Sequence, residues 1–314
     1  MTTMPKITIV IPIFNEAATL SFLLTGIAEL TLAPNEVIVI DSGSTDTSVA
    51  IIEKWAIDNG FGEERLRVIT NPGGMPGANR NRGITASKSE WIAFIDAGIV
   101  PSPDWLACLW SCADKTQAKA IYGLCHFEAD PPFEKAVCAL SYGCTATHPV
   151  LPASLFHRSV FDKVGLFRED LRTAEDILWM RAVEQAYGPK IICESALVYY
   201  RHFPTNVSAV IRKWWISSQH AIQAEIYSRK IWILPGFFTI VIMWLVMKPI
   251  IGVSLLLIYI LVRGVLDPMR RSRTLAWWGR SPSSALLAMW LCLVIDAAKS
   301  LCILFASVRR LKQA

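Results

Sequence analysis

The sequence predicts an α/β protein with a mainly parallel, doubly wound sheet, followed by a C-terminal helical membrane segment. Two observations indicate the sheet: short β-branched runs alternate with helical patterns early in the chain, and several of these runs end at polar residues. The third observation is a change of composition. Residues 1–229 carry 20 basic and 24 acidic residues, whereas residues 230–314 carry 11 and 2. Basic residues that flank apolar runs indicate a membrane partner and no nucleic acid.

The first hundred residues contain four apolar runs of strand length, each separated from the next by a helical pattern or a loop. The predicted strands are residues 6–13, 36–40, 67–70 and 91–95. Strands that alternate with helices over short connections are typical of a parallel sheet with helices on both faces. The phosphate-binding glycine motifs of dinucleotide enzymes and of P-loop proteins are absent from the sequence, which disfavours both classes.

Polar side chains follow three of the predicted strands. Asn15 and Glu16 follow the first strand, Asp41 ends the second, and Asp96 follows the fourth. The carboxyl ends of parallel strands meet at one edge of a sheet, where open α/β sheets bind their ligands. Asp96 is followed by Ala-Gly and two nearby prolines, so it either caps the next helix or contributes to a binding pocket, and the stretch alone leaves both open.

Five motifs occur in the order found in family 2 glycosyltransferases, which have the GT-A nucleotide-sugar-binding fold. They are PIFNE at 12–16, IDSGSTD at 40–46, ANRNRGI at 78–84, IDAGIVPSPDWL at 95–106 and AEDILWMRA at 174–182. The chain therefore resembles this family over roughly residues 5–225. The resemblance implies transfer of a sugar from a nucleotide-diphosphate sugar, in particular a UDP-sugar.

The resemblance also implies which residues bind the donor. Asp41 would accept a hydrogen bond from the base, Arg80 would close the pocket, and Asp96 would face the ribose and diphosphate. The complete implied donor site is Pro12, Asn15, Glu16, Asp41, Ser42, Arg80, Asp96, Ala97 and Gly98.

The Asp-Ala-Gly sequence departs from the family's usual Asp-x-Asp motif. Gly98 stands where the second carboxylate would be, so the motif offers one carboxylate to a divalent cation that prefers several hard oxygen ligands. The resemblance implies Mn²⁺ or Mg²⁺ as cofactor, held by Asp96 and by His202 of the YYRHFPT stretch. For His202, an exposed loop histidine is the equally open alternative.

An acidic pair opens a predicted helix in the motif at 174–182. Acids in the first turn of a helix are favoured by its dipole, which gives a purely structural explanation. The resemblance implies instead that Asp176 is the general base that deprotonates the acceptor hydroxyl, with Glu175 supporting it. The sequence shows no obvious second nucleophile before this pair, so a single displacement with inversion is the expected mechanism.

Residues 205–230 have apolar positions at helical spacing, with Arg212 beside Trp214 and Trp215. Tryptophan and basic residues are typical of the membrane interface, so we expect an amphipathic interfacial helix that contributes to acceptor binding. A core helix of the soluble domain is the alternative. The predicted domains are therefore residues 1–204, 205–230 and 231–314.

The last predicted domain contains three apolar runs. Residues 231–247 are nearly long enough to span a bilayer, residues 250–262 are not, and residues 285–308 are long enough although they include Asp296 and Lys299. A kinked span with a return span would place Arg270, Arg271 and Arg273 outside. A hairpin over 231–262 would keep this basic cluster inside, and the positive-inside rule favours it.

These observations predict an inverting glycosyltransferase in the inner or plasma membrane, with its catalytic domain in the cytoplasm. Eight cysteines without paired spacing are expected to be free thiols in a reducing compartment. The expected acceptor is a membrane lipid, a polyprenyl-linked glycan or a cell-envelope polysaccharide. A nucleotidyltransferase-like enzyme and a non-catalytic nucleotide-sugar-binding scaffold remain as alternatives.

Overall fold

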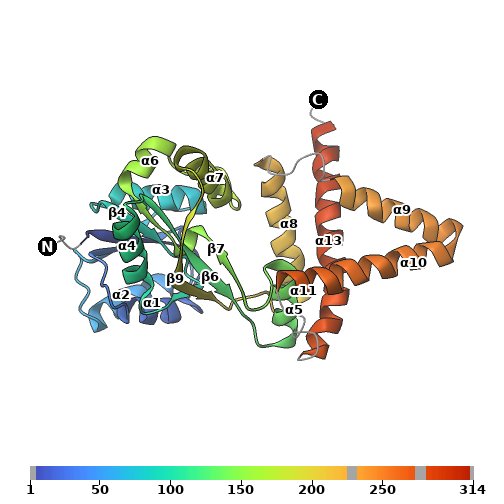
Figure 1. Ribbon diagram of the computed structural model, residues 1–314, viewed down its shortest axis with the longest axis horizontal. Coiled ribbons are helices and arrows are strands. Elements are labelled where there is room, and N and C mark those ends of the chain that lie inside the picture. Colours follow the sequence, from blue (N-terminus) through green and yellow to red (C-terminus); the bar gives the residue numbers. More distant parts are fainter. Residues whose placement is uncertain (1–4, 225–231, 273–280, 312–314) are drawn as a thin grey trace. The chain divides into compact units, whose positions relative to one another are not determined.

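The computed structural model describes residues 5–224, 232–272 and 281–311 (Figure 1). They form two compact units. The first comprises the described residues within Met1–His126 and Thr147–Tyr200, and the second those within Phe127–Ala146 and Arg201–Ala314. The predicted boundary at residue 204 lies close to the change of unit at Tyr200. Residues 127–146, however, pack with the C-terminal helices.

The first unit is a nine-stranded sheet with helices. Its strands are β1 (Ile7–Ile13), β2 (Glu36–Asp41), β3 (Leu66–Thr70), β4 (Trp91–Phe94), β5 (Ile99–Pro101), β6 (Ala120–Phe127), β7 (Ala146–Pro149), β8 (Leu155–His157) and β9 (Ile191–Tyr200). Its helices are α1 (Leu20–Ala28), α2 (Ser48–Asp58), α3 (Pro76–Ala86), α4 (Trp105–Thr116), α6 (Arg158–Val164) and α7 (Glu175–Tyr187), with a 3₁₀ turn η1 at Leu151–Ala153. The strand order is β3-β2-β1-β4-β8-β6-β9-β5, and β7 pairs with β6.

The α/β fold is confirmed, but the sheet is mixed where we predicted it to be mainly parallel. Strands β3, β2, β1 and β4 are parallel, whereas β8 runs antiparallel to β4 and to β6, and β5 runs antiparallel to β9. A parallel pair needs a long crossover, usually a helix, whereas antiparallel strands need none. After β4, helix α4 still follows β5, but β5 and the next strand, β6, are not neighbours in the sheet, so no parallel pair forms there.

The core of the first unit lies between the sheet and helices α3, α6 and α7. Strands β1 and β2 are buried along almost their whole length, which explains their continuous β-branched composition. Aromatic rings fill the space beneath α7: Phe161 stacks on Trp179 with ring centroids 5.2 Å apart, and Phe167 lies 4.7 Å from the same indole. This packing positions the start of α7.

The second unit is helical. Its helices are α5 (Pro132–Ser141), α8 (Val207–Gln223), α9 (Ile233–Met247), α10 (Pro249–Ile260), α11 (Asp267–Arg271) and α13 (Pro282–Leu311), and a π-helical turn, η3 (Leu261–Leu266), joins α10 to α11. Helix α5 belongs here because the backbone N–H of Cys144 donates to Ser272 Oγ (2.9 Å) and Arg271 donates to the carbonyl of Ser141 (2.8 Å).

Two helices of the second unit are long and apolar enough to cross a membrane, judged by length and composition: Pro249–Arg271 and Pro282–Ser307. The apolar run at 250–262 was predicted to be too short to span a bilayer, but the helix that contains it continues through η3 into α11 and is long enough. Arg263 makes this possible by pairing with Asp267 one turn later, at 2.7 Å. Arg273 lies outside the described residues.

Candidate active site

The carboxyl ends of β1, β2 and β4 lie at the same edge of the sheet. The parallel register pairs Ile13 with Asp41 and Val10 with Phe94. The residues that follow these strands are therefore neighbours at this edge, as predicted from the sequence. Pro12 is paired with Ile40 inside the sheet, just before the edge. Ala97 is buried, and Gly98 occupies the turn that the backbone N–H of Ile99 closes by donating to the carbonyl of Asp96.

Arg80 of α3 is the link between the sheet edge and the acidic pair of α7. Its Nη2 donates to Asp96 Oδ1 (2.9 Å) and its Nη1 to Glu175 Oε1 (2.6 Å). Arg80 and Glu175 are both buried, whereas the Asp96 side chain is 39% exposed. The Arg80 guanidinium thus binds one solvent-exposed acid, Asp96, and one buried acid, Glu175. The structure brings three predicted site residues together from three segments.

The charges around Arg80 alter the acid–base properties of the cluster. Burial disfavours the charged form of Arg80, but attraction from Asp96, Glu175 and Asp176 raises its pKa above the ordinary value. Burial raises the pKa of Glu175, and the attraction of Arg80 opposes that rise. Burial likewise raises the pKa of Asp176, opposed by Arg80 and by the backbone N–H of Ile177. The cluster therefore contains two carboxyl groups poised to bind protons more tightly than free acids.

Two atoms of the cluster, Arg80 Nε and Glu175 Oε2, are buried without a hydrogen-bond partner among the residues that the structure describes. Thr173 Oγ1, which precedes them on the loop before α7, is also buried and unpaired. Buried polar groups in folded proteins are nearly always hydrogen-bonded. Beside the part-exposed Asp96, these atoms are therefore suited to donate a hydrogen bond to, or accept one from, a ligand or an ordered water.

Helix α7 begins at a strained residue. Ala174 precedes Glu175 and has φ +76°, a left-handed conformation that residues with a Cβ rarely adopt. Strain of this kind persists where surrounding packing determines it, and it concentrates at functional sites. Here it turns the chain so that both acids enter the first helical turn beside Arg80.

The other predicted donor residues fix the loop that follows β2. Asp41 accepts hydrogen bonds from the backbone N–H (3.0 Å) and hydroxyl (2.6 Å) of Ser44. Asn15, at φ +55°, accepts from the backbone N–H of Thr45 (2.8 Å), and the backbone N–H of Glu16 donates to Ser48 Oγ (2.8 Å). These contacts give the loop a defined shape at the edge of the proposed donor site.

Sequence reasoning missed two asparagines of α3. Asn79, which is buried, donates to Ser42 Oγ (2.6 Å), and Asn71 donates to Asn79 Oδ1 (2.8 Å). The side chain of Asn81 donates to the backbone carbonyl of Phe167 (2.9 Å) and accepts from the backbone N–H of the same residue (2.9 Å). These two bonds fix the loop before α7. The signal was present as the repeated asparagines around Arg80, but their partners are distant in sequence.

The described residues contain no group of three or more His, Cys, Asp or Glu side chains that could hold a metal ion. Asp96 can supply one carboxylate oxygen, because Arg80 engages Oδ1 and the side chain is part-exposed. The residues of this chain thus fit a cation only if the donor's diphosphate provides further oxygen ligands. His202 is exposed and belongs to the second unit.

The predicted acceptor residues lie on α8 in the second unit. Arg212 and Trp215 line a groove of about 580 Å³ along this helix, together with Val207, Ser208, Ile211 and Ile216. Trp214 packs beside Lys213, whose ammonium lies 5.5 Å from the indole centroid. Trp215 also packs on α13, where its ring centroid lies 6.1 Å from that of Phe305. Helix α8 therefore packs in part on α13 and in part lines an exposed groove.

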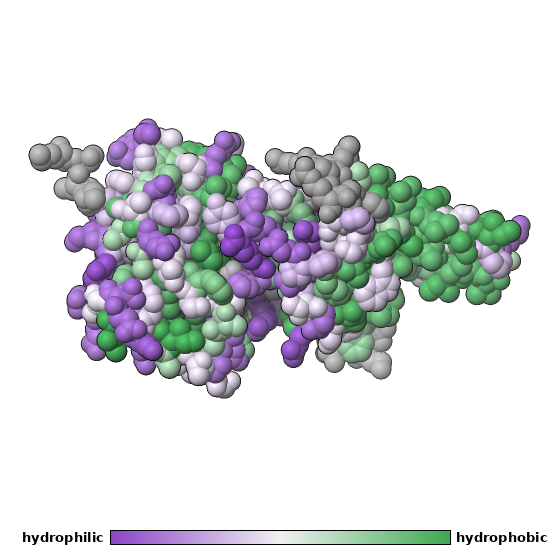
Figure 2. All heavy atoms as spheres, turned by 90° about the horizontal axis from the view of Figure 1, so that it is seen from below, coloured by the Kyte–Doolittle hydropathy of each residue, from purple (hydrophilic) through white to green (hydrophobic). Residues whose placement is uncertain are grey.

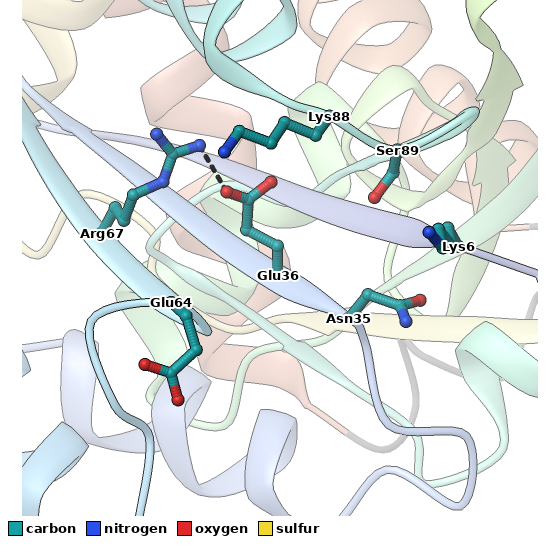
Figure 3. Close-up of a pocket in the computed structure, with 7 residues that line it drawn as sticks. All are labelled: Lys6, Asn35, Glu36, Glu64, Arg67, Lys88 and Ser89. Atoms are coloured by element: carbon teal, nitrogen blue, oxygen red, sulfur yellow. Dashed lines mark hydrogen bonds and ion pairs between the residues drawn. The ribbon is translucent and has the colours of Figure 1, made fainter.

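A second cavity, of about 350 Å³, lies at the opposite, amino-terminal edge of the sheet (Figure 3). Its lining residues are Lys6, Asn35, Glu36, Glu64, Arg67, Lys88 and Ser89. Arg67 forms an ion pair with Glu36, and Thr8 donates to the other oxygen of that carboxylate (3.1 Å). These contacts satisfy the buried acid from within the protein. The cavity is remote from the strand ends that carry the candidate site.

Comparison with known proteins identifies the family. The model of the family described as "Glycosyl transferase family 2" matches residues 8–165, which is half of the chain. Validoxylamine A glucosyltransferase of Streptomyces hygroscopicus subsp. limoneus is 31% identical over 129 residues, covering 39% of this chain and 27% of that protein. Matched regions span 27% to 64% of the lengths of the first four curated relatives.

Two solved structures share the fold. The mannosyltransferase PcManGT from Pyrobaculum calidifontis, solved in complex with GDP-Man and Mn²⁺, has a TM-score of 0.57 and 17% identity, covering 96% of this chain and 88% of that chain. Residues 1–349 of TarS from S. aureus, in complex with UDP-GlcNAc, have a TM-score of 0.50 and 15% identity, covering 88% and 92%. With the family match and the GT-A-type sheet, the conclusion is that this chain belongs to glycosyltransferase family 2.

Proposed function

We propose that this chain is an inverting glycosyltransferase that moves a sugar from a nucleotide-diphosphate sugar to a hydroxyl group of a membrane-associated acceptor. The observation that carries the proposal is the buried Arg80, which joins the donor-edge acid Asp96 to the acidic pair at the start of α7. A donor site and a general base must lie side by side for such a transfer. Arg80 holds both halves in one cluster.

On the donor side, the loop shaped by Asp41 and Asn15 would receive the nucleoside, and Asp96 would face the ribose and diphosphate. Two structural neighbours were solved with a nucleotide sugar, UDP-GlcNAc in one and GDP-Man in the other. They support a nucleotide-sugar donor, and we propose a UDP-sugar. The edge position of the loop and the partial exposure of Asp96 are consistent with this role.

On the acceptor side, Asp176 would act as the general base. The acceptor hydroxyl gives its proton to the Asp176 carboxylate as its oxygen forms a bond to the anomeric carbon. The bond from that carbon to the diphosphate oxygen breaks, and the nucleoside diphosphate leaves with the electron pair. One displacement inverts the anomeric centre. The raised pKa of Asp176 makes it a stronger base than an exposed carboxylate, which favours this proton transfer.

A divalent cation, Mn²⁺ or Mg²⁺, would bind at Asp96 with the donor's diphosphate and offset the negative charge that develops on the leaving group. PcManGT was solved with Mn²⁺, which supports a cation in a protein of this fold. His202 remains the second ligand that the family resemblance implies. Arg80 also contributes positive charge beside Asp96, because its pKa stays above the ordinary value.

The apolar helices of the second unit support a membrane location. That the catalytic unit lies on the cytoplasmic side is part of our proposal. An acceptor in or beside the bilayer follows from such an anchor: a lipid, a polyprenyl-linked glycan or a growing polysaccharide. The groove that contains Arg212 and Trp215, with Trp214 next to it, is the proposed contact for this acceptor.

The test is incubation of the full chain with several radiolabelled nucleotide sugars and a lipid extract, with and without Mn²⁺ or Mg²⁺. Labelled lipid or glycan together with free nucleoside diphosphate is the expected result. Release of pyrophosphate would identify a nucleotidyltransferase instead. Donor binding without any product, in each donor and acceptor combination, would identify a non-catalytic binding protein.

A further inference from the structure

Helices α9 and α10 form an antiparallel hairpin in the second unit (Figure 1). They meet at Lys248, where the backbone leaves the helical conformation. Phe237 stacks on Tyr259 with ring centroids 5.2 Å apart, and the backbone of Leu245 passes so close to Gly252 that a Cβ there would meet it at 2.5 Å. The two arms are therefore tightly packed against each other.

The outer surface of this hairpin is apolar along both arms, and the exposed Lys248 stands at its tip. Figure 2 shows it as a projection with an almost unbroken hydrophobic surface. Its exposed large apolar side chains include Ile240, Ile242, Met243, Val246, Met247, Ile250, Val253, Leu257, Ile258, Leu261 and Val262. A helix that is hydrophobic all round belongs in a protein core or in lipid, and these side chains have no core around them in the described residues.

The apolar parts of both hairpin arms are too short to cross a bilayer, although the helix Pro249–Arg271 as a whole is long enough. Helix α9 has 15 residues, which is about 22 Å of helix, against a hydrocarbon thickness of about 30 Å. The apolar part of the other arm ends at Arg263, 15 positions after Lys248. In the sequence, Arg229 and Lys230 stand just before the first arm. Basic residues thus flank both apolar runs in the sequence.

Helix α13 has a different surface. One face is buried against the rest of the second unit, including α5 and α8, at positions spaced three or four apart: Ala285, Ala288, Cys292, Ile295, Ala298 and Cys302. The opposite face is exposed and apolar along a stripe of Leu286, Trp290, Leu301 and Leu304. This one-sided exposure is typical of a helix that lies on a membrane surface.

Helix α13 runs across the base of the hairpin and not alongside it (Figure 1). The helices cross closely at Gly264, where a Cβ would meet Met289 Cα at 2.8 Å. A charged cluster marks the crossing: Asp296 accepts from Arg263 (2.8 Å), from Lys299 (3.2 Å) and from Tyr259 (2.6 Å). The charges of the hairpin and of α13 therefore meet at the hairpin base.

We propose that the α9–α10 hairpin enters a phospholipid bilayer from one face without crossing it, and that α13 lies along the same face. Because α13 runs across the hairpin base, the hairpin and α13 cannot both lie parallel to the bilayer normal. With the hairpin inserted, the exposed stripe of α13 meets the interface, and Arg263 and Lys299 lie near the lipid phosphates. If α13 crossed instead, Asp296 and Lys299 would lie near mid-bilayer, where charges are costly.

This inference deepens the proposed membrane association and rests on it, and cysteine accessibility in sealed membranes tests it. Full-length variants Lys248→Cys and Gly279→Cys are each expressed in a bacterial host and exposed to a membrane-impermeant maleimide, in right-side-out and inverted vesicles. Peptide mass spectrometry locates the label, so the eight native cysteines stay in place. An N-terminal epitope tag, tested by protease in the same vesicles, reports the side of the catalytic unit.

We expect Gly279→Cys to react from the side that carries the N-terminal tag, and Lys248→Cys to react only after detergent. Labelling of Gly279→Cys from the opposite side would show that the chain crosses the membrane between the catalytic unit and residue 279, and would overturn the proposal. Labelling of Lys248→Cys from either side of sealed vesicles would also overturn it, because the tip would then not be buried in lipid.

A partition experiment supplies an independent measurement. The exposed Leu257 of the hairpin is changed to Glu, and the exposed Ile57 of α2, in the first unit, is changed to Glu as the matched control. Leu257→Glu should weaken sedimentation with phosphatidylglycerol vesicles at least ~10-fold, because a carboxylate in hydrocarbon costs more than a tenfold change in an equilibrium constant. Ile57→Glu should have little effect. Equal effects of the two variants would contradict hairpin insertion.

The outcomes separate this inference from the proposed function. A protein that inserts its hairpin but transfers no sugar would refute the enzyme activity and leave the anchor intact. A protein that transfers sugar but whose Gly279→Cys variant is labelled on the far side would refute the anchor and leave the enzyme activity intact.

Discussion

Arg80 and Glu175 are 95 positions apart in the sequence, and they form a buried ion pair with an Nη1–Oε1 distance of 2.6 Å. The pair joins α3, which follows the donor-side loop, to α7, which carries the proposed base. Asp96 accepts from the other guanidinium nitrogen. Glu175 and Asp96 lie on different segments, so the Arg80 side chain alone connects the donor side of the first unit to the acceptor side in this cluster.

Breaking this pair should destabilise the first unit. Arg80→Met leaves Glu175 buried without its partner, so we expect the free energy of unfolding to fall by roughly 3–5 kcal/mol. Chemical denaturation measures this loss. The double variant Arg80→Met with Glu175→Met should recover part of the stability while remaining inactive. A double variant with wild-type activity would show that the pair has only a structural role.

Asp176→Asn should remove the proposed general base. We expect kcat to fall by about 10²–10⁴-fold, the range for loss of a positioned proton acceptor, with little change in donor affinity. Steady-state kinetics and donor titration by calorimetry separate the two effects. Asp162→Asn, on α6 outside the cluster, is the matched control. An unchanged turnover number in the Asp176 variant would remove this residue from the mechanism.

Activity should depend on pH through the raised pKa of Asp176. The base works only when ionised, so kcat should rise with pH through that pKa, at higher pH than an ordinary aspartate with a pKa near 3.9 would give. Burial is the main cause of the shift. A pH–rate profile measured across the acid range tests this. A profile already flat from pH 4 upwards would contradict the assignment.

The free energy of unfolding should fall as pH rises over the same range in which kcat increases. The folded protein binds protons at Glu175 and Asp176 more tightly than the unfolded chain, because burial raises both pKa values. The stability from these groups is therefore present below the unfolded pKa values and is lost as pH rises through the folded ones. Denaturation series for the wild type and Glu175→Gln should differ in slope over this window. Parallel slopes would argue against a raised pKa at Glu175.

Asp96→Ala should weaken donor binding without unfolding the protein, because the Asp96 side chain is part-exposed. If the cation binds here with the diphosphate, Mn²⁺ should increase the donor affinity of the wild type and have little effect on the variant. Calorimetric titration of donor with and without Mn²⁺ makes the comparison. Equal enhancement by Mn²⁺ in both proteins would place the cation elsewhere.

The left-handed residue before α7 offers a test of strain. Ala174→Gly removes the Cβ from a residue at φ +76°, and we expect the free energy of unfolding to rise by up to about 1 kcal/mol. Ala182→Gly, inside the same helix, should instead lower it by about 1 kcal/mol. Denaturant titration of both variants measures the contrast, and a loss of stability in both would show that Ala174 is not strained.

The sequence by itself determined the local elements of the catalytic half. Apolar and β-branched runs predicted β1, β2, β3 and β4. The runs of β1 and β2 are continuous because these strands are covered on both faces. The polar residues at their ends predicted one shared edge, and the parallel register confirms it. Motif order identified the family, which the family model confirms.

Tertiary structure alone decided which of these residues touch. Nothing local in the ANRNRGI motif shows that Arg80 meets Glu175, because that contact depends on how α3 and α7 pack on the sheet. The antiparallel half of the sheet was also not readable, since short strands such as β8 leave little periodic signal. Likewise, the helix after Lys248 continues past residue 262, where Arg263 interrupts the apolar run and donates to Asp296, 33 positions later in the sequence. Contacts between distant segments have no local pattern, and only the folded chain brings them together.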